Sequence, residues 1–199
     1  MKDVPNFNIE REINKEFIAG VDEAGRGPLC GPVVAAAVIF KSMSDKMPLI
    51  MDSKKMNHRE RQIAFDWIME NCFVGIGKCD PNEIDSINIL QASMLAMKRA
   101  IDNLPKRPNF VLIDGNRLPQ NIIGRAIVKG DSKSLSIAAA SIIAKETRDK
   151  IMQDLALLFP QYGWEKNAGY PTPEHLRAIK EFGINEHYRK SFKPIKDLL

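Results

Sequence analysis

Residues 17–40 read FIAGVDEAGRGPLCGPVVAAAVIF, a stretch that holds two short apolar runs. The runs at 17–21 and 33–40 have the length and the boundaries of buried strands. Between them, AGRGPLCGP contains three glycines and two prolines, which do not continue regular structure. The stretch therefore predicts two paired strands joined by a loop of special shape.

Strands and helices are expected to alternate along the rest of the chain. Three more apolar runs, each bounded by Gly, Pro or Asn, predict strands at 73–79, 110–113 and 125–128. Capping residues and apolar periodicity predict helices over 59–70, from Pro81 to Ile101, from after Asp131 to Pro160, and from Pro173 onward. We therefore expect the α/β fold class, with a mixed five-stranded sheet flanked by helices. A core at residues 16–159 would carry a small C-terminal helical subdomain at residues 160–199.

The composition suits one folded domain. A chain of 199 residues with 44% hydrophobic residues can fill a single core. No run approaches the roughly 18 apolar residues of a membrane span, and the polar stretch at residues 1–11 lacks the apolar segment of a signal peptide. We expect a cytoplasmic protein without a membrane partner, and a monomer by default.

The three cysteines do not show the pattern of a disulfide framework or of a metal site with sulfur ligands. Cys30, Cys72 and Cys79 are an odd number and show no C-x-x-C spacing. This pattern predicts neither a disulfide framework nor a zinc site. Any metal in this protein is therefore expected to be held by oxygen ligands.

The net charge of the chain is +4, and basic residues are concentrated in the C-terminal tail. Residues 187–199 contain one acid, Asp197, and four bases interleaved with two aromatic residues; the bases are Arg189, Lys190, Lys193 and Lys196. Such a segment suits contact with phosphates. A solvated tail with incidental lysines is an equally good interpretation of the sequence alone.

Carboxylates stand at the ends of predicted strands. Asp22 and Glu23 directly follow the first strand, Asp114 follows the fourth, and Asp131 lies between the fifth strand and the long helix. Ligands of α/β folds bind beyond the carboxyl ends of strands, so three of these acids would converge if the first and fourth strands are neighbours. Converging acids without His or Cys suit Mg²⁺ or Mn²⁺. Alternatively, Asp131 is the N-cap of its helix, and Asp114 forms a turn with Gly115.

The spacing of the first two acids raises a geometric question. Adjacent residues of a regular strand point to opposite faces, so Asp22 and Glu23 cannot both enter one site from such a strand. We therefore expect the chain to end its strand or to bulge at Glu23. In the loop that follows, Gly25 and Gly27 allow close backbone approach to a ligand, and Arg26 supplies donors for phosphate. A tight turn with a solvated arginine is the alternative.

Longer motifs carry a resemblance to a known family. The run DEAGRGPLCGPVVAAAVI resembles the first signature of the ribonuclease HII family. MDSKKM, NILQASMLAMKRAI, LIDGN, KGDSKSLSIAAASIIAKETRD, AGYPTPEH and HYRKSFKP resemble its later segments in order and spacing. The resemblance covers about residues 16 to 195. Two departures are that Cys30 stands where alanine is more frequent, and that Asn167 and Ala168 precede Gly169 where a basic residue is frequent.

The resemblance implies a ribonuclease H-like fold and a set of site residues. Asp22, Glu23, Asp114 and Asp131 would be metal ligands. Gly25, Arg26 and Gly27 would sense the ribose 2′-hydroxyl at an RNA–DNA junction, the group by which a protein distinguishes RNA from DNA. Tyr170 would stack on the neighbouring sugar, and a tyrosine in a Gly-Tyr-Pro turn is displayed as stacking requires. Backbone phosphates would contact Ser53, Lys54 and Lys133, for which solvated surface positions are the alternative.

The implied activity is an endonuclease that hydrolyses RNA in RNA–DNA hybrids and cuts 5′ to single ribonucleotides in duplex DNA. Hydrolysis would use divalent metal, with two Mg²⁺ or Mn²⁺ ions, and would leave 3′-hydroxyl and 5′-phosphate ends. One alternative is a resolvase- or integrase-like DNA nuclease with the same acid-rich fold. Another is a nucleic-acid-binding module without catalytic activity. The Gly-Arg-Gly loop and Tyr170 argue against the DNA nuclease. The presence of all four acids argues against the binding module.

Overall fold

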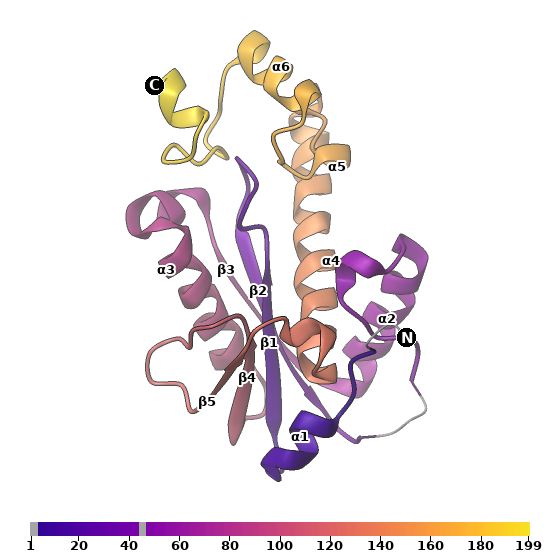
Figure 1. Ribbon diagram of the computed structural model, residues 1–199. Coiled ribbons are helices and arrows are strands. Elements are labelled where there is room, and N and C mark those ends of the chain that lie inside the picture. Colours follow the sequence, from indigo (N-terminus) through magenta and orange to yellow (C-terminus); the bar gives the residue numbers. More distant parts are fainter. Residues whose placement is uncertain (1–3, 44–46) are drawn as a thin grey trace.

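A five-stranded sheet with the order β3-β2-β1-β4-β5 forms the centre of the computed structural model, which describes residues 4–43 and 47–199 (Figure 1). Its strands are β1 (Ile18–Ala24), β2 (Val33–Phe40), β3 (Cys72–Cys79), β4 (Phe110–Asp114) and β5 (Gly124–Ile127). β2 pairs antiparallel with β1 and β3, whereas β4 pairs parallel with β1 and β5. The predicted mixed sheet is confirmed, and the first and fourth strands are neighbours.

Helices cover both faces of the sheet. They are α1 (Asn8–Ile13), α2 (His58–Asn71), α3 (Pro81–Asp102), α4 (Leu135–Leu158), α5 (Trp164–Asn167) and α6 (Pro173–Phe182). Short 3₁₀ turns are η1 (Ser53–Lys55), η2 (Gly130–Ser132), η3 (Pro160–Tyr162) and η4 (Ile195–Leu198). The capping boxes that begin α2 and α3 have the predicted residues, Asn57 with Glu60 and Asp80 with Glu83. α3 also has a kink at Asn88, with φ 65°, that the apolar periodicity does not reveal.

The alternating side chains of the central strands build two separate cores. Ala36 and Val38 of β2 face α4 and α2, whereas Ala35, Ala37 and Ile39 face α3. β1 lies so close to α4 that a Cβ on Gly20 would come within 2.0 Å of the backbone carbonyl carbon of Ser136. This contact fixes the first half of β1 against the beginning of α4.

The C-terminal residues cover the loop between β1 and β2 (Figure 1). Their cluster contains Trp164 and Tyr162, whose rings stack at 4.9 Å, and extends to Leu29 and Cys30 of the loop and Met152 of α4. The segment that follows Asp22 and Glu23 of β1 is therefore packed against residues more than a hundred positions later. In the parts of the chain that the structure describes, no helix has the length and apolarity needed to cross a membrane.

Candidate active site

Three of the four predicted acids lie at one end of the sheet. Asp22 and Glu23 occupy β1, and Asp114 ends β4. The parallel register pairs Val21 with Ile113, so Asp22 and Asp114 are the next residues of adjacent strands. The neighbouring strands thus bring these carboxylates together, as their positions in the sequence predict.

The predicted irregularity at Glu23 is wrong. β1 continues as regular strand to Ala24, with Glu23 paired to Ala35 and Ala24 paired to Val34 of β2. The antiparallel partner keeps β1 straight, and the chain leaves the strand only at Gly25, where φ is 94°. Both acids nevertheless lie near Asp114, whose charge contributes to raising the pKa of each.

Asp131 joins the group from η2 and is not the N-cap of α4. The N-cap is Ser134, whose hydroxyl accepts a hydrogen bond from the backbone N–H of Ile137 at 3.3 Å. The Asp114 carboxylate accepts a hydrogen bond from the backbone N–H of Gly130 at 2.6 Å. This bond ties the end of β4 to the turn that carries Asp131.

The electrostatics of the acids reflect their crowding. Burial raises the pKa of Asp22 well above its usual range, and the charges of Glu23, Asp114 and Asp131 raise it further. Burial also raises the pKa of Glu23, against the opposing effect of Arg26, whose guanidinium lies 3.2 Å from the Glu23 carboxylate. Such repulsion makes the site favourable for a cation.

Asp52 is a further acid near Asp131 and is not among the predicted site residues. Burial raises the pKa of Asp131 first, and the charge of Asp52 raises it next, followed by that of Asp114. Lys54 and Lys55 oppose the shift. Asp52 begins the D-S-K segment of MDSKKM and directly precedes Ser53 and Lys54, two of the predicted phosphate contacts. This position is the feature of the sequence that indicates a place for Asp52 in the site.

The four predicted acids are of the kind that binds a divalent cation, although their carboxylates do not surround one point in the structure. Within residues 4–43 and 47–199, no three acidic, histidine or cysteine side chains surround a common point closely enough to ligate one ion. Asp22 and Asp114 each use one carboxylate oxygen to accept a backbone N–H, from Glu23 and Gly130 respectively. Hard carboxylate oxygens and raised pKa values suit Mg²⁺ or Mn²⁺. Side-chain rotation would have to complete the coordination.

The raised pKa of Asp22 predicts how stability depends on pH in EDTA. An acid with a higher pKa in the folded state binds its proton more tightly when folded, so unfolding releases protons. The free energy of unfolding should therefore fall as pH rises from about 4, the ordinary pKa of aspartate, through the folded value. Asp22→Asn should raise this free energy at pH 7 by about 1 kcal/mol or more, and the gain should vanish near pH 4. Urea unfolding of both proteins at several pH values measures it, and an equal gain at all pH values would contradict it.

Tyr170 stands beside the glycine loop and is exposed. Its side chain is displayed as predicted, with 46% of the residue accessible. A Cβ on Gly27 would lie 3.4 Å from the Tyr170 ring. Arg26 and Gly27 are exposed, while Gly25 is buried. The structure thus brings the predicted loop and the predicted tyrosine together on one surface.

A buried histidine holds the backbone of Tyr170. The indole N–H of Trp164 can only donate, so Nε2 of His175, 3.1 Å away, must accept. Nδ1 of His175 therefore carries the proton and donates it to the carbonyl of Tyr170 at 2.8 Å. Burial lowers the pKa of His175, which keeps this neutral form in place.

Asn167 explains one departure from the family pattern. Its side-chain oxygen accepts the N–H of Gly169 at 2.8 Å, and its side-chain nitrogen donates to the carbonyl of Tyr162 at 2.7 Å. The residue therefore builds the turn that presents Tyr170. Cys30, the other departure, is buried beneath this turn, and burial raises the pKa of its thiol to about 12, which makes it unreactive.

The three predicted phosphate contacts have different surroundings. Ser53 is buried, with its N–H bonded to the Ser141 hydroxyl at 3.2 Å, so a solvated position is wrong for it, and its side chain is also little accessible to a phosphate. Lys54 is exposed, and the Lys133 ammonium donates to the carbonyl of Val128 at 2.8 Å. Lys54 and Lys133 are both exposed, but within the described part of the chain only the Lys133 ammonium is bonded to a backbone carbonyl.

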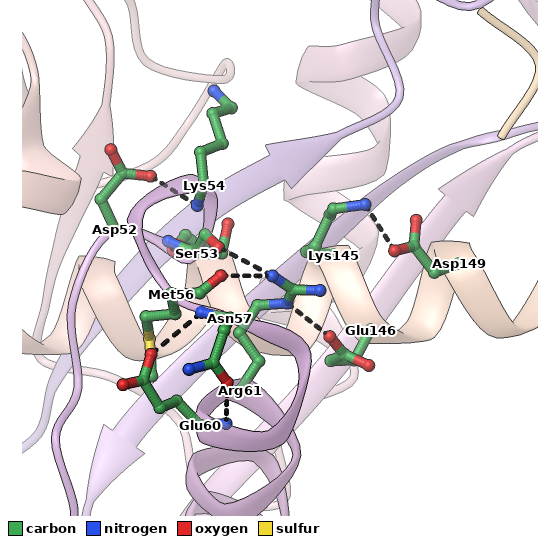
Figure 2. A network of polar contacts seen from close by, with 11 residues as sticks. Asp52, Ser53, Lys54, Met56, Asn57, Glu60, Arg61, Lys145, Glu146 and Asp149 are labelled. Atoms are coloured by element: carbon green, nitrogen blue, oxygen red, sulfur yellow. Dashed lines mark hydrogen bonds and ion pairs between the residues drawn. The ribbon is translucent and has the colours of Figure 1, made fainter. Parts of the chain in front are cut away.

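Arg61 fastens the segment that carries Ser53 and Lys54 (Figure 2). Its guanidinium donates to the carbonyls of Ser53 and Met56 at 3.3 and 2.7 Å and to the carboxylate of Glu146 in α4 at 2.6 Å. The D-S-K segment is therefore fixed to the same helix that follows Asp131.

Two buried arginines hold the loop from Gly25 to Pro32. Arg148 of α4 donates to the carbonyls of Cys30, Pro32 and Ala168 at 3.0 to 3.2 Å. Arg189 of the basic tail is fully buried, so both interpretations of the tail, phosphate contact and solvation, are wrong for this residue. Its long side chain reaches inward to the loop.

Comparisons with known proteins agree on one family. The profile described as Ribonuclease HII matches residues 19–195. A Ribonuclease HII of Magnetococcus marinus is 54% identical over 187 residues, covering 92% of this chain and 87% of that protein. The structure of the PCNA:RNase HII complex from Archaeoglobus fulgidus contains a chain with 26% identity and a TM-score of 0.77, covering 89% of this chain and 96% of that one. The ribonuclease H2 from Pyrococcus horikoshii OT3 has 25% identity and a TM-score of 0.74, with coverage of 92% and 97%.

Proposed function

Because this chain belongs to the ribonuclease HII family of nucleic-acid-cutting enzymes and has its ribonuclease H-like fold, we propose that it cuts duplexes at ribonucleotides. The substrates are RNA–DNA hybrids and duplex DNA with single embedded ribonucleotides. Cleavage falls on the 5′ side of the ribonucleotide and leaves 3′-hydroxyl and 5′-phosphate ends. The observation that carries this proposal is that the acids of β1 and β4 lie next to the loop at residues 25–27, whose Arg26 and Gly27 are exposed beside Tyr170.

The proposed metal ligands are Asp22, Glu23, Asp114 and Asp131. Two Mg²⁺ or Mn²⁺ ions, when bound, would activate water and stabilise the leaving oxygen. The mutual repulsion that raises the pKa of Asp22 supports this assignment, because a divalent cation relieves it. The Asp114 carboxylate also accepts a hydrogen bond from the N–H of Gly130, the residue before Asp131. This bond fixes the positions of Asp114 and Asp131 relative to each other.

The remaining residues would place the substrate. Gly25, Arg26 and Gly27 would lie against the ribose 2′-hydroxyl, and Tyr170 would stack on the neighbouring sugar. Lys54 would contact a backbone phosphate, with Ser53 and Lys133 in supporting positions. A monomer is the proposed working unit. The cytoplasm is the proposed compartment.

One assay tests the function against its alternatives. A DNA duplex with a single ribonucleotide and its all-DNA twin are incubated with Mg²⁺ or Mn²⁺, and again with EDTA. We expect cutting of the first duplex only, 5′ to the ribonucleotide, and only with metal. Cutting of both duplexes would indicate a resolvase-like nuclease, and binding without metal-dependent cutting would indicate a nucleic-acid-binding module.

Tyr170→Ala should lower kcat/KM for the single-ribonucleotide duplex by about tenfold, since stacking on an aromatic ring contributes roughly 1–3 kcal/mol for a base and a sugar contact is expected at the lower end of that range. Tyr170→Phe keeps the ring and should retain most of the activity. Steady-state cleavage of both variants measures the difference. Because the side chain is 46% exposed, its loss should change the melting temperature little. Equal activity of the alanine variant and the wild type would remove the stacking role.

A further inference from the structure

Arg189 makes an unusual set of contacts with the glycine loop. Its guanidinium donates to the carbonyl of Gly25 at 2.6 Å, to that of Arg26 at 3.0 Å, and to that of Gly31 at 2.9 and 3.0 Å. The residue is 0% exposed. Burial and the nearby charge of Arg148 lower its pKa to about 9, so the side chain is still charged at neutral pH. The buried guanidinium of Arg189 is thus hydrogen-bonded to three carbonyls of the loop.

These contacts determine which way the loop's peptide groups point. In a trans peptide, the carbonyl of one residue and the N–H of the next point in opposite directions. Because the Gly25 and Arg26 carbonyls face Arg189, the N–H groups of Arg26 and Gly27 face away from it. Both residues are exposed, and neither N–H has an acceptor among residues 4–43 and 47–199. Two adjacent donors are therefore presented on the surface beside Tyr170.

The position of Arg189 is itself fixed by the backbone. Its N–H donates to the carbonyl of Leu29 at 2.8 Å, and the N–H of Gly31 donates to the carbonyl of His187 at 2.9 Å. The Phe192 ring lies 5.0 Å from the guanidinium. The planar guanidinium makes four hydrogen bonds to these carbonyls from three separated nitrogens, a geometry that the compact ammonium of lysine, with three donors on one nitrogen, does not reproduce.

We propose that Arg189 is a positioning residue for ribose selectivity, which holds the Gly25 and Arg26 carbonyls inward so that the Arg26 and Gly27 N–H groups donate to the 2′-oxygen. This inference rests on the proposed function. It makes the 2′-hydroxyl an acceptor at this loop and assigns selectivity partly to a residue that does not touch the substrate. Arg61 is the matched contrast, because it braces the backbone of the D-S-K segment, which faces phosphates common to RNA and DNA.

The test compares Arg189→Lys with Arg61→Lys. Fluorescence anisotropy in EDTA gives the affinities for a duplex with one ribonucleotide and for its all-DNA twin, and cleavage is measured with Mg²⁺. Arg189→Lys should reduce the preference for the ribonucleotide duplex by about tenfold, the order expected when hydrogen bonds from a charged donor are lost. Arg61→Lys should weaken binding to both duplexes by the same factor. An unchanged preference in a folded Arg189→Lys protein would overturn the inference, whereas absence of any preference in the wild type would instead refute the proposed function.

A measurement on the wild type does not depend on how the variant folds. Amide resonances of Arg26 and Gly27 in the ¹⁵N-labelled full chain are followed while either duplex is added in EDTA. Both should shift downfield, and their hydrogen exchange should slow, with the ribonucleotide duplex more than with the all-DNA twin. Equal responses to the two duplexes would refute donation from these N–H groups.

Discussion

Asp22→Asn is expected to slow metal-dependent cleavage of the single-ribonucleotide duplex by about 1000-fold. A lost carboxylate ligand weakens stabilisation of the transition state by several kcal/mol, and about 4 kcal/mol corresponds to this factor. Asn keeps the size of the side chain and an oxygen that can still accept the N–H of Glu23, bonded at 2.7 Å in the structure. The fold should therefore survive, and single-turnover rates over a range of Mg²⁺ concentrations would measure the loss.

Asp66→Asn is the matched control for this substitution. Asp66 lies exposed on α2, where its carboxylate accepts a hydrogen bond from Gln62 at 3.0 Å. Its replacement removes the same charge from the same chain and should leave the rate unchanged. An Asp22→Asn protein of full activity would remove Asp22 from the metal site. Lower activity combined with higher stability in EDTA would fit a carboxylate whose repulsion is relieved by the metal.

The fold could be predicted wherever neighbouring residues determine the structure. β2 has the predicted range because its apolar run is bounded by Pro32 and by polar residues after Phe40. α3 begins as predicted because Asp80, Pro81 and Glu83 satisfy the free N–H groups of its first turn. Local chemistry is sufficient in both cases.

Features that depend on distant partners could not be predicted. The regular course of β1 through Glu23 results from its pairing with β2, whose register the sequence does not give. Arg189 resembles a surface cation, yet its partners Gly25 and Gly31 lie about 160 residues earlier. Asp52 approaches Asp131 because η1 packs beside α4, which no local pattern shows. In each case a long-range contact overrides the local expectation.

Gly25→Ala is expected to reduce cleavage by about 100-fold and the free energy of unfolding by about 3 kcal/mol. The backbone φ of 94° disfavours any Cβ, and an added Cβ would lie 2.1 Å from Nε of Arg148 and 2.8 Å from the carbonyl oxygen of Pro32. Arg148 cannot move aside cheaply, because its guanidinium is buried and bonded to the carbonyls of Cys30, Pro32 and Ala168.

Displacement of the loop should cost activity beyond the loss of stability, since a misplacement of about 1 Å in a binding group can lower a rate by about 100-fold. Gly183→Ala separates the two causes. Gly183 also has a positive φ, 76°, but no atom lies within 4 Å of its added Cβ. This variant should lose roughly 1–3 kcal/mol of stability from backbone strain and should cleave at the wild-type rate. Urea unfolding and cleavage of both variants at a temperature where each is folded measure the two effects. A Gly25→Ala protein with the wild-type rate would show that the loop tolerates displacement, which would remove the basis for its role in recognising the ribose.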